Sequence, residues 1–167
     1  MKRYAYIVRH AKAEDGGFMT RDFDRQLTDT GRLDAALIGQ WLAEQHLKPD
    51  YMVSSLAARA IQTAQLMATA LGFDPKAIKT TRSLYDEGPN AYLQAINEAP
   101  EDCEHLMIFG HNPDISYFAE YLADKPIGSM SKGAVAIIEF EGLAWNEISA
   151  HTGRLKVYKT PKELRTR

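Results

Sequence analysis

Short apolar runs alternate with amphipathic stretches through the first two thirds of the chain. The runs are rich in aromatic and β-branched side chains, which is typical of buried strands, at residues 4–8, 50–55 and 105–109, with a weaker run at 77–84. Between them, apolar side chains recur every three or four residues and predict helices at 28–46, 60–71, 89–96 and 112–122. For the last helix, Asn112 has the residue type of an N-cap, and Pro113 suits the first helical position.

The pattern changes near both ends of this alternating region. Residues 11–27 carry glycines and charges with no steady period, so we expect a long loop, and long loops in compact domains are often functional. After Gly133 the pattern becomes strand-like, with expected strands at 134–140, 145–149 and 155–158. The basic tail from Lys156 to Arg167 is expected to be a frayed terminus.

Strands alternating with helices predict an α/β fold. We expect three layers, with a mostly parallel central sheet, helices on both faces and an antiparallel edge hairpin near the C-terminus. The 167 residues are the size of one domain, which we take to be residues 1–167.

Composition narrows the class of protein. With 45% hydrophobic and 25% charged residues the chain is expected to fold, and a net charge of −2 argues against nucleic acid as a partner. The single cysteine, Cys103, excludes an internal disulfide framework and a multi-cysteine zinc site. The apolar run near the N-terminus is too short for a signal peptide, and no window is long enough for a membrane span. We therefore expect a soluble, cytoplasmic protein without membrane association.

Two histidines and two arginines follow the predicted strands. His10 and His111 come directly after strands, Arg9 precedes His10, and Arg59 lies near the start of a helix. Ligands of parallel sheets bind at the carboxyl ends of the strands, so these side chains are expected to converge. Guanidinium groups match phosphate oxygens, and a neutral imidazole is a competent nucleophile. The set therefore predicts a phosphate site.

Other phosphate and hydrolase chemistries lack their motifs. The chain has no Gly-Lys pair for a P-loop, no G-x-G-x-x-G and no G-x-S-x-G. A cysteine phosphatase needs an arginine six residues after its cysteine, where this chain has Phe109. Histidine is the nucleophile that remains.

Four segments carry a resemblance to a known family. Val8-Arg9-His10-Ala11 resembles an Arg-His-Gly motif, and residues 25–31 resemble R-P-L-T-x-x-G. Residues 55–64 are similar to S-x-x-x-R-A-x-Q-T-A, and residues 110–113 to G-H-N-P. Together and in this order they resemble the histidine phosphatase superfamily, the phosphoglycerate-mutase-like group, and within it the SixA-type phosphohistidine phosphatases.

The resemblance implies a role for each matching residue. His10 would be the nucleophile that forms a phosphohistidine, and Arg9, Arg59 and His111 would bind the phosphoryl oxygens, with no metal and no cofactor. A ring N–H donated to a backbone carbonyl would fix the His10 tautomer, and His111 would favour its protonated form beside a phosphate dianion. Ala11 replaces the family's glycine, which we expect to be tolerated unless φ is positive there. Gln26 replaces a proline and should affect only loop stiffness.

The proton donor for the leaving group stays open at this point. The resemblance offers Asp86 or Glu87, after the third strand, or Asp22 in the first long loop, with Asp24 close by. Phosphoramidates need a donor less than phosphate esters do, so the absence of an evident acid favours phosphohistidine or another activated substrate.

The substrate and several rival functions also stay open. The short chain has no room for a large cap, which favours a phosphorylated protein as partner over a small phosphorylated metabolite. The rivals are a small-molecule phosphomonoesterase, a metallohydrolase using His10, His111 and an aspartate, and a pseudophosphatase that binds without turnover. A mutase would need a more enclosed pocket.

Overall fold

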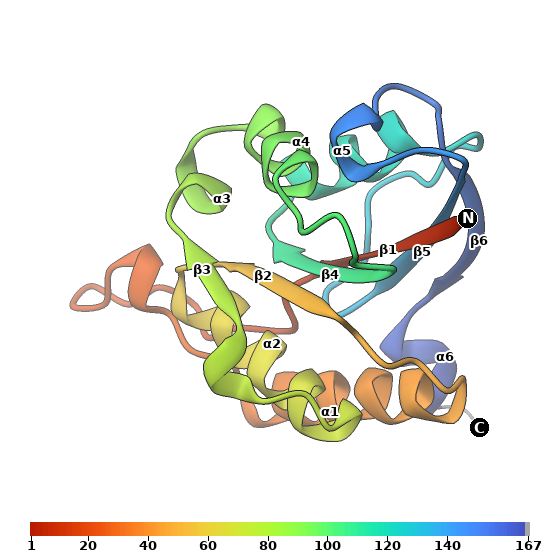
Figure 1. Cartoon of the computed structure of the whole chain (residues 1–167). Coiled ribbons are helices and arrows are strands. Elements are labelled where there is room, and N and C mark those ends of the chain that lie inside the picture. The colour runs from red at the N-terminus through yellow and green to blue at the C-terminus, as the bar shows by residue number, and fades with distance from the viewer. Residues whose placement is uncertain (166–167) are drawn as a thin grey trace.

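A computed structural model describes residues 1–165, which form a six-stranded sheet in the order β3-β2-β4-β1-β5-β6 (Figure 1). The strands are β1 (Lys2–Arg9), β2 (Tyr51–Ser55), β3 (Lys79–Thr81), β4 (His105–Gly110), β5 (Val135–Glu141) and β6 (Arg154–Lys159). The helices are α1 (Asp29–Glu44), α2 (Ala58–Leu71), α3 (Ser83–Asp86), α4 (Pro89–Asn97), α5 (Asp114–Leu122) and α6 (Pro161–Arg165). Short 3₁₀ helices are η1 (Asp22–Asp24), η2 (Pro75–Ala77) and η3 (Trp145–Glu147).

The sheet confirms the predicted α/β fold. The pairs β3–β2, β2–β4 and β4–β1 are parallel, whereas β5 runs antiparallel to β1 and β6 antiparallel to β5. Helices α1, α2 and α6 lie on one face and α3, α4 and α5 on the other (Figure 1). Within residues 1–165, no helix has both the length and the apolar character that crossing a membrane requires.

The central strands β1 and β4 are buried on both faces because helices cover both sides of the sheet. Ile7, Val8, Ile108 and Phe109 are all completely buried. In the parallel register Ile7 pairs with Ile108 and Arg9 with Gly110. The two strands therefore end level with each other, and the residues that follow them emerge side by side.

Residues 145–149 were predicted as a strand, but Trp145–Glu147 form η3 and residues 148–149 belong to no strand. The indole of Trp145 is buried and donates to the Cys103 carbonyl (2.7 Å). The Asn97 side chain on α4 donates to the carbonyls of Trp145 and Ile148. These carbonyls accept hydrogen bonds from a side chain and not from a neighbouring strand, so the segment turns.

Residues 77–84 were also predicted as a strand, but only Lys79–Thr81 pairs with β2. The Thr81 hydroxyl accepts a hydrogen bond from the backbone N–H of Ser83, which starts a turn. The strand therefore ends early, and α3 follows directly.

The start of α5 differs from the prediction by one residue. The helix begins at Asp114 with Pro113 in the cap position, so Asn112 is not its N-cap. The Asn112 amide instead donates to the Ser129 hydroxyl and the Met130 carbonyl, and its oxygen accepts from Ser116. Asn112 thus ties the start of α5 to the segment that precedes β5.

The C-terminal segment is ordered where a frayed terminus was predicted. Residues 156–159 belong to β6, and α6 packs on α1 with Leu164 buried and Arg165 paired with Asp34. Residues 166–167 lie outside the described residues.

Candidate active site

The ends of β1 and β4 bring His10 and His111 together. The backbone N–H of His10 donates to the Gly110 carbonyl (3.0 Å), and the two imidazole centroids lie 5.2 Å apart. The histidines are 6% and 7% exposed. The structure therefore brings the two histidines together at the strand ends, as the sequence predicted.

The hydrogen bonding of His10 leaves one ring nitrogen available. Its Nδ1 lies 2.7 Å from the Ala11 carbonyl, which can only accept, so Nδ1 carries the proton. Burial lowers the pKa of His10 to about 3. The hydrogen bond to the Ala11 carbonyl acts in the opposite direction and raises the pKa, whereas positive charge on His111, Arg59 and Arg9 lowers it further. At neutral pH the ring is thus uncharged, with a lone pair on Nε2 that can attack an electrophile.

Arg9 and Arg59 flank the two histidines. Arg9 is the last residue of β1 and donates through Nη1 to the Met130 carbonyl (2.8 Å). Arg59 lies in the first turn of α2 and is 6% exposed. Across residues 1–165, the buried side-chain polar atoms without a hydrogen-bond partner are Arg9 Nε, Arg59 Nε and His111 Nδ1.

These three unpartnered nitrogens belong to the residues predicted to hold phosphate. A buried donor without a partner is costly, on the order of 1–3 kcal/mol each. A multivalent oxyanion would satisfy several such donors at once. The surroundings of His10 are therefore chemically suited to an anion such as a phosphoryl group.

His111 is held from both its side chain and its backbone. Its Nε2 lies 2.8 Å from the Ser55 hydroxyl at the end of β2, and its backbone N–H donates to the Tyr92 hydroxyl (3.1 Å). Burial, followed by the charge of Arg59, lowers the pKa of His111 to about 4. A bound dianion would act in the opposite direction, so protonation of His111 beside phosphate stays a prediction.

Gly110 is required by the packing beneath His111. A Cβ atom at this position would lie 2.1 Å from the Tyr92 hydroxyl oxygen, an overlap that the buried ring cannot relieve. The Tyr92 hydroxyl itself donates to the Leu84 carbonyl (2.7 Å). The glycine of the G-H-N-P segment thus has a steric reason.

Thr63 connects the nucleophile loop to the helix that carries Arg59. Its hydroxyl accepts from the backbone N–H of Ala11 (3.0 Å) and donates to the Arg59 carbonyl (2.8 Å). Ala11 is fully buried and is not among the non-glycine residues with positive φ. The backbone therefore accepts alanine in place of the family's glycine, as expected.

Asp22 was predicted as a site residue, and it lies beside Arg59. Its carboxylate accepts from Arg59 Nη2 (3.0 Å), from the Tyr85 hydroxyl (2.7 Å) and from Arg25 Nη1 (2.8 Å). These hydrogen bonds, that of Tyr85 first, hold the pKa of Asp22 well below its usual range. Asp22 is therefore an ionised acceptor here. The neighbouring Asp24 pairs with Arg21 at the surface (2.8 Å).

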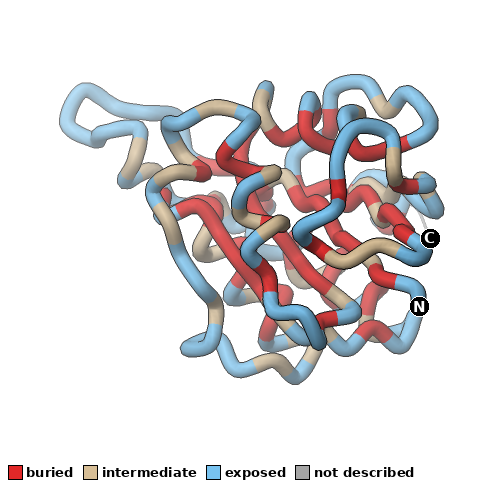
Figure 2. The backbone as a smooth tube through the Cα atoms, turned by 45° about the horizontal axis from the view of Figure 1, so that its top comes forward, coloured by how far each residue is buried: buried red, intermediate tan, exposed pale blue. Residues whose placement is uncertain are grey.

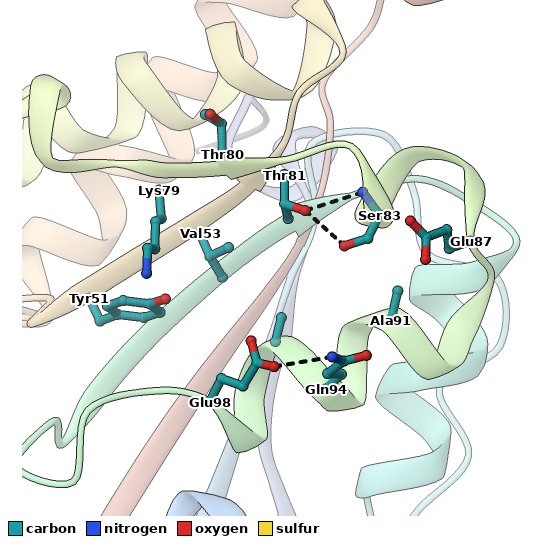
Figure 3. Close-up of a pocket in the computed structure, with 11 residues that line it drawn as sticks. Tyr51, Val53, Lys79, Thr80, Thr81, Ser83, Glu87, Ala91, Gln94 and Glu98 are labelled. Atoms are coloured by element: carbon teal, nitrogen blue, oxygen red, sulfur yellow. Dashed lines mark hydrogen bonds between the residues drawn. The ribbon is translucent and has the colours of Figure 1, made fainter.

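The other two candidate acids are directed elsewhere. Asp86 pairs with Arg82 on the surface of α3 (3.1 Å). Glu87 lines a separate pocket of about 300 Å³ between the β2–β3 edge and α4, together with Thr81 and Gln94 (Figure 3). Neither side chain joins the group around His10.

Four further side chains contact the predicted site residues without having had a predicted role: Ser55, Thr63, Tyr85 and Tyr92. Ser55 and Thr63 lie inside the quoted S-x-x-x-R-A-x-Q-T-A segment, which was the signal available for them. Gln62 of the same segment accepts from the backbone N–H of Leu27 and so anchors the first loop. Nothing in the sequence pattern marked the two tyrosines.

Comparisons with known proteins identify the family of this chain. The family model of the histidine phosphatase superfamily (branch 1) matches residues 5–86. An uncharacterised protein of Picosynechococcus sp. is 32% identical over 165 residues, covering 95% of this chain and 97% of that protein.

Solved structures show the same fold. A candidate phosphohistidine phosphatase SixA from Nakamurella multipartitia is similar with a TM-score of 0.82 and 27% identity, over 96% of this chain and 97% of that one. A candidate SixA from Agrobacterium tumefaciens is similar with a TM-score of 0.78 and 27% identity, over 95% and 98%.

Proposed function

The chain belongs to branch 1 of the histidine phosphatase superfamily, and on that premise we propose that it hydrolyses phosphohistidine through a covalent intermediate on His10. The substrate of this proposal is a phosphohistidine side chain on another protein. No metal or cofactor takes part in the proposed reaction.

One observation carries the proposal: an uncharged His10 ring with a free Nε2 is surrounded by buried side-chain nitrogens that lack hydrogen-bond partners. Two of these nitrogens are the cationic donors Arg9 Nε and Arg59 Nε, and the third is Nδ1 of His111. Anion-binding groups that are already in place stabilise the charge on a transferring phosphoryl group without reorganisation.

The proposed chemistry has two steps. In the first, His10 Nε2 forms a bond to phosphorus while the bond to the substrate's imidazole nitrogen breaks, and the substrate histidine leaves. In the second, water attacks the same phosphorus, the bond to Nε2 breaks, and inorganic phosphate leaves. Arg9 and Arg59 would hold the phosphoryl oxygens throughout, and the Ala11 carbonyl would keep Nδ1 as the protonated nitrogen.

The surroundings of the leaving group support a phosphoramidate over a phosphate ester. An alkoxide leaving group gains about 10²–10⁴-fold from a positioned acid. Asp22 is held as an ionised acceptor, Asp86 pairs with Arg82, and Glu87 lines a separate pocket. An imidazole that leaves with its own ring proton does not need such an acid.

A labelling experiment tests the proposal. The protein is mixed with a ³²P-phosphohistidine peptide, quenched within one turnover, and examined for acid-labile, alkali-stable label. We expect label on His10, none in His10→Ala, and undiminished label in His46→Asn, a control at the exposed end of α1. In the steady state the phosphohistidine peptide should be cleaved faster than a phosphoserine peptide of the same sequence.

Three outcomes would overturn it. Turnover that survives in His10→Ala would remove the nucleophile. Phosphoserine cleaved in preference to phosphohistidine would favour the phosphomonoesterase alternative. Tight binding of the phosphopeptide without any turnover would indicate a pseudophosphatase.

A further inference from the structure

Tyr85 links three parts of the site that are distant in sequence. Its hydroxyl donates to Asp22 Oδ2 (2.7 Å) across 63 residues. Its ring lies edge-on to His111, with centroids 5.5 Å apart, and the Arg59 guanidinium carbon lies 5.9 Å from the ring centroid. On its outer side the ring meets Phe23 of η1 edge-on at 5.0 Å.

The hydrogen bonds around Asp22 fully occupy Oδ2, the carboxylate oxygen that contacts the residues of the site. Oδ2 accepts from both Tyr85 and Arg59, and Oδ1 accepts from Arg25. The Asp22 carbonyl accepts a further bond from Arg59 Nη1 (2.7 Å). A carboxyl group can act as a general acid only when one oxygen carries a proton and faces the leaving group.

We propose that Tyr85 is a positioning residue that holds the Asp22 carboxylate as an acceptor on Arg59 and thereby withholds an acid from the leaving group. The inference rests on the proposed function and refines its substrate class. With Tyr85 in place the site is restricted to phosphoryl groups on nitrogen leaving groups that bring their own proton. Without the Tyr85 hydroxyl, Oδ2 of Asp22 gains a free lone pair that can take up a proton.

The charged and titratable groups that face Asp22 come from three elements besides its own. Arg59 comes from α2, Tyr85 from α3 and His111 from the end of β4, while Arg25 follows η1 itself. The Tyr85 hydrogen bond is the largest of the influences that lower the pKa of Asp22. Since the arginines would remain, removal of this hydroxyl alone isolates the contribution of Tyr85.

The test compares Tyr85→Phe with the intact protein on two small substrates, free phosphohistidine and glycerol phosphate, between pH 5 and 8. Phenylalanine keeps the ring contacts and removes only the hydroxyl. We expect the ratio of kcat/KM for glycerol phosphate to that for phosphohistidine to rise about tenfold, with the largest rise at acid pH. The gain should disappear in Tyr85→Phe combined with Asp22→Asn. Tyr117→Phe, at an exposed position on α5, is the matched control.

A direct titration supports the kinetic arm. The ¹³C carboxyl resonance of Asp22 should titrate at higher pH in Tyr85→Phe than in the intact protein. An unchanged titration, an unchanged substrate ratio, or an equal loss on both substrates would overturn the inference. Failure of the proposed function is seen separately, as absence of label on His10 in the intact protein with phosphohistidine.

Discussion

Replacing Thr63 by valine tests how the nucleophile loop is held. The substitution keeps the shape of the side chain but removes the acceptor of the Ala11 N–H, and both residues are fully buried. A buried N–H left without a partner costs about 1–3 kcal/mol. The Arg59 carbonyl loses one hydrogen bond as well, but it lies in α2, where the helical hydrogen bonding continues. We therefore expect the free energy of unfolding to fall by about 2 kcal/mol.

The same helix supplies a matched control. The Thr69 hydroxyl donates to the Gln65 carbonyl (3.0 Å) at an exposed position, so Thr69→Val should change stability by less than about 0.5 kcal/mol. Urea unfolding of both variants at pH 7 measures the difference, and the activity of Thr63→Val should fall as well, because Ala11 also holds His10 Nδ1. Equal stabilities for the two variants would refute this account of Thr63.

Two further predictions follow from packing and from titration. A Cβ atom at Gly31 would lie 2.1 Å from the Lys12 carbonyl oxygen, so Gly31→Ala should lower the free energy of unfolding by about 1–3 kcal/mol. Gly17 has open space around it, so Gly17→Ala should leave the stability unchanged. Thermal unfolding of the two variants measures the difference. The pKa of His10 is lowered to about 3 and that of His111 to about 4, so below about pH 6.5 the unfolded chain binds protons that the folded chain does not. Stability is therefore retained above pH 6.5 and should fall by about 2 kcal/mol for each histidine by pH 5, as measured by urea unfolding. An unfolding free energy that is flat between pH 7 and 5 would contradict the assignment of two buried neutral rings.

The parts of the fold that could be predicted are those with a strong local pattern. Strands β1 and β4 are apolar throughout because both of their faces are buried, and His10 and His111 could be placed because strand ends converge in such sheets. The strand prediction for residues 145–149 was wrong because their composition suits a strand, while the hydrogen bonds that bend the segment come from Asn97 on α4.

The roles of Asp22 and Tyr85 could not be separated from the sequence alone. A loop aspartate looks the same whether it donates a proton or accepts three hydrogen bonds. The difference depends on a tyrosine 63 residues away and on Arg25 and Arg59. Such long-range pairing leaves no periodic trace along the chain.

The level ends of β1 and β4 have a consequence for how such a protein can diversify. The spacing of the two imidazoles depends on strand register, so it does not depend on the length of chain that joins the strands. Residues 15–20 are exposed along their whole length (Figure 2), and segments could be lengthened or exchanged there without displacing either ring. The reaction centre and the surface that selects what reaches it are therefore free to change independently.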